Sequence, residues 1–188
     1  NAVVPGDLLR LESWFVDQFV ESFTEVPRRI TLDIDLFDDP THGDQQLTFF
    51  HGYYSQHQYF VRVITCAEND QVVLPTLLFG TASATLGVDE DLTQVVEQLR
   101  QRFPDVQIHV RADSGFATPA FYAVCEQLRL EYTVGIGMNE VLKRDSESTL
   151  TTAVKAWEQT GQPQRHFLGE EYQAGTWDAP RWVVIKCE

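Results

Sequence analysis

Residues 29–43 read RITLDIDLFDDPTHG, and the first half of this stretch decides the fold around it. Every second residue from Ile30 to Leu36 is apolar, and the positions between them include Asp33 and Asp35. Successive side chains of a strand point to opposite faces, so this alternation predicts a strand with one apolar face and one acidic face. The apolar face predicts that the strand lies at the centre of a sheet, buried on that side.

The segments around this strand alternate between helical and extended patterns. Apolar residues at spacings of three and four, together with helix-start and helix-stop signals, predict helices over residues 7–23, 89–103, 118–128 and 148–159. Alternating or β-branched and aromatic runs predict further strands over residues 47–54, 59–66, 72–79, 106–110, 132–136, 165–173 and 181–187. This order of elements predicts an α/β protein built on a mixed sheet that is flanked by helices.

Composition places the chain among ordinary soluble globular proteins. Its 188 residues are 43% hydrophobic and 22% charged, which is enough apolar material for a sizeable core. No run approaches the roughly 20 apolar residues that span a bilayer. The N-terminus lacks the pattern of a signal peptide, so we expect a cytoplasmic protein. The three cysteines are scattered and form no CxxC pair, which predicts buried, reduced thiols.

The formal net charge of −14 is unusual for a protein that holds DNA, because phosphate neutralisation generally requires a basic surface. The chain begins at Asn1 without a methionine and ends just after the apolar run Trp182–Ile185. We interpret it as an excerpt whose basic flanking parts are missing.

Three aspartates are candidates for a metal site. Asp33 and Asp35 share a face of one strand about 6.5–7 Å apart, where they repel each other unless a cation or other donors lie between them. Asp113 follows a later strand and precedes a helix, a position where ligands gather in open α/β sheets. Carboxylates from two strand ends suit Mg²⁺ or Mn²⁺. The alternatives are solvated acids on a half-exposed strand and an aspartate that caps its own turn.

Two other functions fit parts of the sequence. The segment Leu32–Asp35 ends in the Asp-x-Asp pattern of haloacid-dehalogenase-like phosphatases, although Phe37 stands where Thr or Val is usual. The acidic, aromatic-rich composition also fits a non-catalytic interaction module derived from an enzyme. A metal held by Asp33 and Asp35, with Asp113 far away, would favour the phosphatase. The absence of any metal site, with solvated aspartates, would favour the interaction module.

Residues 32–43, 50–54 and 111–116 resemble, in this order, three motifs of DDE-type transposases of bacterial insertion sequences. The resemblance extends over about residues 30 to 139. It implies an RNase H-like fold and a Mg²⁺-dependent reaction that cuts DNA at the element's ends and joins the freed 3′-hydroxyl to target DNA. It also implies that Asp35 and Asp113 are catalytic and bind the metal. The pair Leu36–Phe37 departs from the small residue and Thr that usually follow the first aspartate.

The third acidic residue of the family, a glutamate in a C-terminal helix, has no counterpart in this chain. The resemblance therefore implies an N-terminal helical segment over 1–28, a partial RNase H-like catalytic core over 29–139, and part of a β-rich insertion over 140–188. With two of three acids, the 188-residue chain is expected to be inactive by itself.

Three further residues are secondary candidates for the site. His42 contacts a phosphate or caps its own turn, and the turn is the commoner role. Arg111 faces DNA or forms an ion pair with Asp113, and Asp33 is a further carboxylate beside Asp35. The implied partner is double-stranded DNA, at both the transposon ends and the target. We expect no membrane partner, and a homodimer for the full-length protein.

Overall fold

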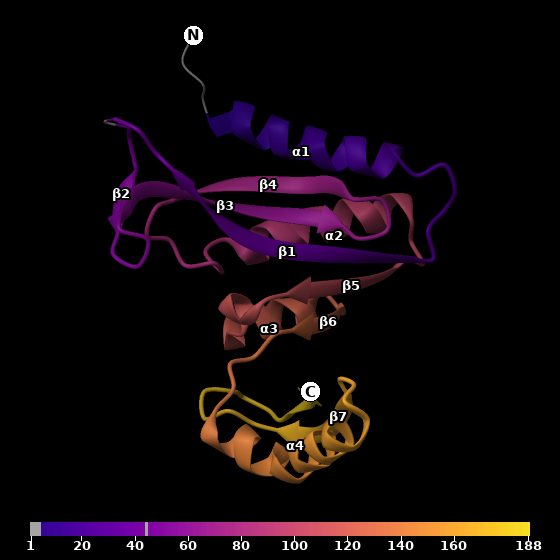
Figure 1. The fold of residues 1–188 in the computed structure, drawn as a ribbon. Helices are drawn as coiled ribbons and strands as arrows, with labels where there is room; N and C mark the ends of the chain where they lie inside the picture. Colours follow the sequence, from indigo (N-terminus) through magenta and orange to yellow (C-terminus); the bar gives the residue numbers. More distant parts are fainter. Residues whose placement is uncertain (1–4, 44) are drawn as a thin grey trace. The chain divides into compact units, whose positions relative to one another are not determined.

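The computed structural model describes residues 5–43 and 45–188 of the chain (Figure 1). The chain divides into two compact units, the first ending at Gly135 and the second comprising Ile136–Glu188. No helix in the described ranges has the length and apolar character needed to cross a membrane.

The first unit contains a six-stranded mixed sheet whose antiparallel half is built on β3 (Gln56–Cys66). Strand β1 (Arg29–Pro40) pairs with one edge of β3, in a register that sets Asp35 opposite Val63. On the other edge, β3 pairs with β4 (Gln71–Phe79) and, further along, with β2 (Phe49–His51). The predicted strand pair is thus present, but β2 is much shorter than the expected segment.

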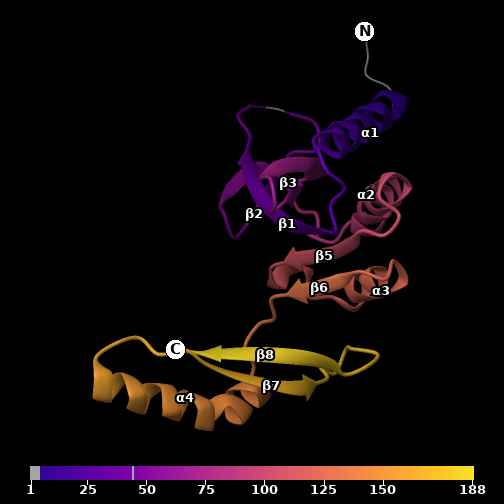
Figure 2. The same cartoon turned by 90° about the vertical axis from the view of Figure 1, so that its right-hand side faces the viewer.

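The parallel half of the sheet continues from the other edge of β1. Strand β5 (Gln107–Ala112) runs parallel to β1, and β6 (Glu131–Val134) runs parallel to β5 (Figure 2). Two crossover helices, α2 (Val88–Arg102) and α3 (Pro119–Gln127), connect β4 to β5 and β5 to β6. Parallel neighbours need such crossovers, because a tight turn cannot bring the chain back to the same end. The carboxyl ends of β1 and β5 consequently point the same way.

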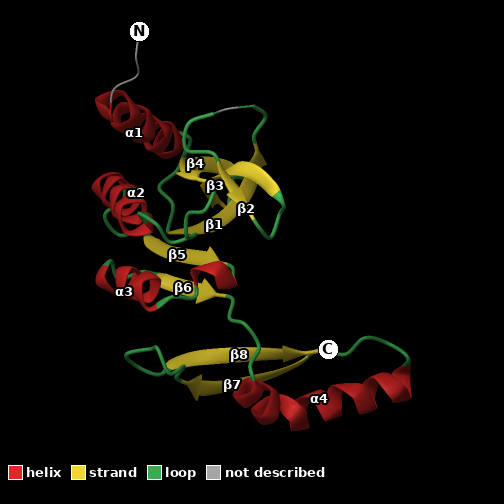
Figure 3. Ribbon diagram, turned by 90° about the vertical axis from the view of Figure 1, so that its left-hand side faces the viewer, coloured by secondary structure: helices red, strands yellow, loops and turns green. Residues whose placement is uncertain are grey.

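Helices cover one face of this sheet. Figure 3 shows α1 (Pro5–Glu21), α2 and α3 on the same side of the strands. Helix α3 begins as the sequence predicts, because the Thr118 side chain accepts a hydrogen bond from the Phe121 N–H and Pro119 is the first helical residue. The apolar positions of the strands face these helices and form the main core, with Ile30, Leu32, Ile34, Ile64, Leu74, Ile108, Val110, Leu92, Val95, Leu99 and Phe121 among its buried members.

One charged side chain lies within the buried face. Arg62 of β3 is 1% exposed and forms an ion pair with Asp91 of α2, with Nη2 2.6 Å from Oδ2. Its Nη1 donates to the carbonyl oxygens of Ala84 and Leu86, and the Thr76 hydroxyl donates to the same Asp91 oxygen. These bonds connect β3 and β4 to the loop before α2. Each of the three guanidinium nitrogens therefore donates to an acceptor, as a buried charge requires.

The second unit packs one helix against a two-stranded antiparallel sheet, β7 (His166–Tyr172) and β8 (Arg181–Cys187). Helix α4 (Glu140–Thr160) starts eight residues before the predicted start at 148, so that boundary was wrong. Asn139 caps the helix by accepting from the N–H groups of Val141 and Leu142. The sequence of α4 shows a weak helical pattern of apolar residues, because the buried residues of this helix are only Leu142, Ser146 and Ala153. The two predicted strands are confirmed.

We predict that Arg62→Ala lowers the free energy of unfolding by about 3–5 kcal/mol, since it leaves the Asp91 carboxylate without its buried partner. Chemical denaturation of the chain measures the loss. Arg29→Ala is the matched control, because its ion pair with Glu131 is about half exposed and should contribute less than about 1 kcal/mol. Equal losses in the two variants would contradict the structural role of the buried pair.

Candidate active site

Asp35 and Asp113 meet at the end of the pairing between β1 and β5. The last matched pair of these parallel strands is Ile34 with Ala112, so Asp35 and Asp113 are the next residue on each strand. Neighbouring strands lie about 4.8 Å apart, which puts the two backbones side by side at this point. Both aspartates are exposed, and Asp35 lies on the face of β1 opposite the helices. The structure thus brings together the two residues singled out in the sequence.

The loop after β5 holds Asp113 in place. The Asp113 carboxylate accepts a hydrogen bond of 2.8 Å from the Gly115 N–H, which caps a short 3₁₀ turn. Gly135, just after β6, donates its N–H to the Ala112 carbonyl oxygen. A Cβ on Gly135 would lie 3.1 Å from the Ser114 nitrogen, so a glycine permits the close packing of this loop. The turn-capping role expected as an alternative is therefore present, and among the described residues the other carboxylate oxygen of Asp113 accepts no hydrogen bond.

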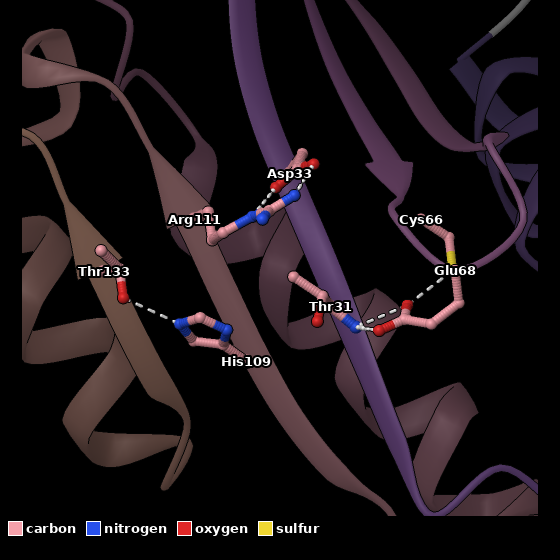
Figure 4. A network of polar contacts seen from close by, with 7 residues as sticks. All are labelled: Thr31, Asp33, Cys66, Glu68, His109, Arg111 and Thr133. Carbon is pink, nitrogen blue, oxygen red and sulfur yellow. Dashed lines mark hydrogen bonds and ion pairs between the residues drawn. The ribbon is translucent and has the colours of Figure 1, made fainter. Parts of the chain in front are cut away.

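Arg111 forms an ion pair with a different aspartate from the one the sequence suggested. The Arg111 guanidinium donates from Nε and Nη2 to the two oxygens of the Asp33 carboxylate, each over 2.6 Å (Figure 4). The expected ion pair of Arg111 with Asp113 is wrong, because Arg111 stands directly opposite Asp33 in the parallel register. The pair raises the pKa of Arg111 through the hydrogen bonds to Asp33. The repulsion expected between Asp33 and Asp35 is relieved by this guanidinium.

A line of further polar contacts continues across the same face of the sheet (Figure 4). His109 of β5 lies 2.9 Å from the Thr133 hydroxyl of β6, and burial, followed by the charge of Arg29, lowers the pKa of His109. At the start of β1, the Thr31 N–H donates to both carboxylate oxygens of Glu68, over 2.8 and 3.0 Å. Burial alone would raise the pKa of Glu68, but the hydrogen bonds from Thr31 hold this pKa below its usual value. These contacts stabilise the strands around the two aspartates.

His42 lies in the exposed loop that follows β1. Its carbonyl oxygen accepts a hydrogen bond from the Gln45 side chain. This contact involves the main chain of His42, so both roles of its side chain, capping the turn and contacting a phosphate, stay predictions.

The donors at the strand ends fit a hard divalent cation. Asp35 and Asp113 both offer carboxylate oxygens, which Mg²⁺ and Mn²⁺ prefer over nitrogen or sulfur. Within residues 5–43 and 45–188, no group of three or more His, Cys, Asp or Glu side chains could hold a metal ion. Two carboxylates alone would leave most of the coordination of such an ion to water, and Mg²⁺ in protein sites commonly keeps several waters.

The sequence matches a protein-family model over residues 1–188, and that family is described as transposase DDE domain, group 1. The chain belongs to this family. The match covers all the residues that carry the resemblance noted in the sequence, including Asp35 and Asp113. Together with the mixed sheet, it confirms the predicted α/β, RNase H-like fold class. No curated protein matches the DDE domain significantly.

Solved structures of transposases and integrases are similar to this DDE domain. The piggyBac transposase in a synaptic complex with hairpin DNA has a TM-score of 0.46 and 12% identity, over 95% of this chain and 37% of that chain. The simian T-cell lymphotropic virus intasome in complex with PP2A regulatory subunit B56 gamma has a TM-score of 0.38 and 16% identity, over 72% and 43%. The HTLV-2 integrase catalytic core domain in complex with magnesium has 0.35 and 10%, over 74% and 79%.

The DDE domain spans less than half of the first two of these chains, at 43% and 37% of their lengths. Their low TM-scores add no argument beyond the family match. Three contacts of the described structure were not found by sequence reasoning: Arg62 with Asp91, Glu68 with Thr31, and His109 with Thr133. Only the first had a signal, because Arg62 interrupts the apolar alternation between Phe60 and Ile64.

We predict that Gly115→Ala disturbs Asp113, since a Cβ there would lie 3.0 Å from the Asp113 carboxylate oxygen that accepts the Gly115 N–H. The strained hydrogen bond should lower the free energy of unfolding by about 1 kcal/mol, as measured by thermal unfolding. Gly52→Ala serves as the control, because a Cβ at Gly52 meets nothing within 4 Å. An unchanged Gly115→Ala variant would show that the cap does not hold the loop.

Proposed function

We propose that this DDE domain is part of the catalytic core of a bacterial insertion-sequence transposase, which cleaves DNA at the element's ends and joins them to target DNA. The single observation that supports the proposal best is the placement of Asp35, within β1, and Asp113, just after β5, each one residue past the last matched pair of the two strands. Family membership supplies the reaction class. The parallel register supplies the geometry that such a reaction needs.

We propose Mg²⁺, or Mn²⁺ in its place, as the cofactor, with Asp35 and Asp113 as the residues that hold it. A divalent cation at such a site provides charge neutralisation and activates a nucleophile during phosphoryl transfer. The two aspartates have no need to act as strong bases and serve through their fixed oxygens. The Gly115 N–H orients the Asp113 carboxylate, and the main chain of β1 orients Asp35, whose Oδ1 accepts from the Leu36 N–H over 2.8 Å.

The proposed partners are double-stranded DNA of the transposon ends and of the target. Contacts with the phosphates require cations that the chain, with a net charge of −14, does not supply in number. We therefore propose that basic segments outside these 188 residues hold the DNA, that the full-length protein is a homodimer, and that it works in the cytoplasm at the nucleoid.

Two competing functions receive less support. In a haloacid-dehalogenase-like phosphatase the first aspartate of Asp-x-Asp is a nucleophile at a strand end. Here β1 continues to Pro40, and Asp33 is held by two hydrogen bonds to Arg111. A non-catalytic module derived from a transposase keeps the same fold, so only a test of activity separates it from the enzyme.

The first test is excision of a marked element in cells. A donor plasmid carries the reading frame that encodes this chain together with its natural flanking DNA, and excision is scored by sequencing the rejoined donor. We expect Asp35→Asn and Asp113→Asn to reduce excision at least about 100-fold, because each removes a charged ligand needed for the transition state. Glu140→Gln, an exposed acid of the second unit, is the control and should excise normally. No excision with the unaltered protein would favour the non-catalytic module.

The isolated 188-residue chain should be inactive on its own. Incubated with Mg²⁺ and a labelled duplex that contains an element end, it should leave the DNA intact, since its described residues assemble two acids and no third. Gel analysis of the labelled strands measures cleavage. Cleavage that disappears in Asp35→Asn would contradict the expected inactivity, although it would support the catalytic role of Asp35.

A further inference from the structure

The ion pair between Asp33 and Arg111 stands immediately before the proposed metal site. The two residues face each other across β1 and β5, and Asp35 and Asp113 follow each of them by two positions. Residues two apart on a strand share a face at a separation of about 6.5–7 Å. A charged pair in this place is therefore within Coulombic range of any cation bound between Asp35 and Asp113.

The geometry of the pair occupies Asp33 completely. Arg111 donates through Nε to one carboxylate oxygen and through Nη2 to the other, both over 2.6 Å, in a fork-to-fork arrangement (Figure 4). Such bidentate pairs are stronger and more directional than a single contact between point charges. The side chains are 36% and 50% exposed, so the pair contributes little to global stability, and its position next to the site calls for another explanation.

Without Arg111, the acidic face of β1 would present two carboxylates that are both available to bind a cation. Asp33 and Asp35 are two residues apart on β1, and both lie on the face opposite the helices. A cation could then bind between Asp33 and Asp35 on one strand instead of between Asp35 and Asp113 on two strands. Only the second position uses the loop aspartate that the Gly115 N–H orients.

We propose that Arg111 acts as a guard of the metal site, by which we mean that it keeps Asp33 from ligating the metal. Arg111 occupies both carboxylate oxygens of Asp33, and the cation is then bound by Asp35 and Asp113. Arg111 is thus a positioning residue that determines which acids ligate the metal. This inference rests on the proposed metal site, and it adds a residue that acts on the site without touching the cation.

The test is a Mn²⁺ titration of the 188-residue chain, with free Mn²⁺ measured by electron paramagnetic resonance at low ionic strength. Arg111→Gln should tighten binding roughly five- to tenfold, because it removes a positive charge about 7 Å from a divalent ion and frees Asp33. Arg111→Lys separates these two effects, since lysine keeps the charge but cannot hold both carboxylate oxygens. We expect Arg111→Lys to bind Mn²⁺ about threefold more tightly than the unaltered chain. The double variant Asp33→Asn/Arg111→Gln has no freed carboxylate, so its Mn²⁺ affinity should lie within about twofold of that of the unaltered chain.

Two controls make the outcome specific. Arg29→Gln removes a positive charge at the other end of β1, where Arg29 pairs with Glu131, and should leave Mn²⁺ affinity unchanged. Thermal unfolding without metal should show closely similar midpoints for all the Arg111 variants, because the pair is exposed.

The results separate the guard from the metal site itself. If Asp35→Asn leaves Mn²⁺ binding unaltered, the proposed metal site is wrong. If Asp35→Asn abolishes binding while Arg111→Lys binds Mn²⁺ as the original chain does, the metal site holds and the guard is overturned. Tighter binding in both Arg111 variants, lost again when Asp33 is also replaced, supports the guard.

Discussion

The pairing of β1 with an antiparallel strand on one edge and a parallel strand on the other is the constraint on which the rest of this structure depends. The antiparallel side builds a stiff platform from β3 and β4. The parallel side pairs β5 with the first half of β1, up to Ile34 and Ala112. Asp35 and Asp113 follow this last matched pair, so the long-range pairing of the two strands places their backbones next to each other.

The two faces of the sheet divide the work between them. The face toward the helices contains the main core, and its one buried guanidinium is satisfied by Asp91 and by main-chain carbonyl groups. The opposite face carries Asp33 and Asp35, the aspartates of β1 that belong to the candidate site. Since side chains alternate along a strand, an apolar requirement on one face leaves the other free to hold acids at every second position. Stability and the candidate site can therefore use the same strand without competing for its residues.

Charge is managed locally on the polar face. Arg111 neutralises Asp33, the Gly115 N–H orients Asp113, and Asp35 remains exposed with its carboxylate accepting from the neighbouring Leu36 N–H. This arrangement gives the three aspartates three different environments although two of them look equivalent in the sequence. The distinction arises from what stands across the strand pairing, and a single guanidinium is enough to produce it.

The sequence by itself determined the elements and the class of fold, because periodicity of apolar residues reflects which side of each strand or helix is buried. It also indicated Asp35 and Asp113 through their motifs and their positions at strand ends. Only the tertiary structure decided that Arg111 pairs with Asp33 and not with Asp113, since that choice depends on the register between two strands more than 70 residues apart along the chain. The start of α4 at Glu140 was likewise decided by the cap at Asn139 and by the packing of a few residues of the helix. So few buried residues leave almost no periodic pattern of apolar residues in the sequence.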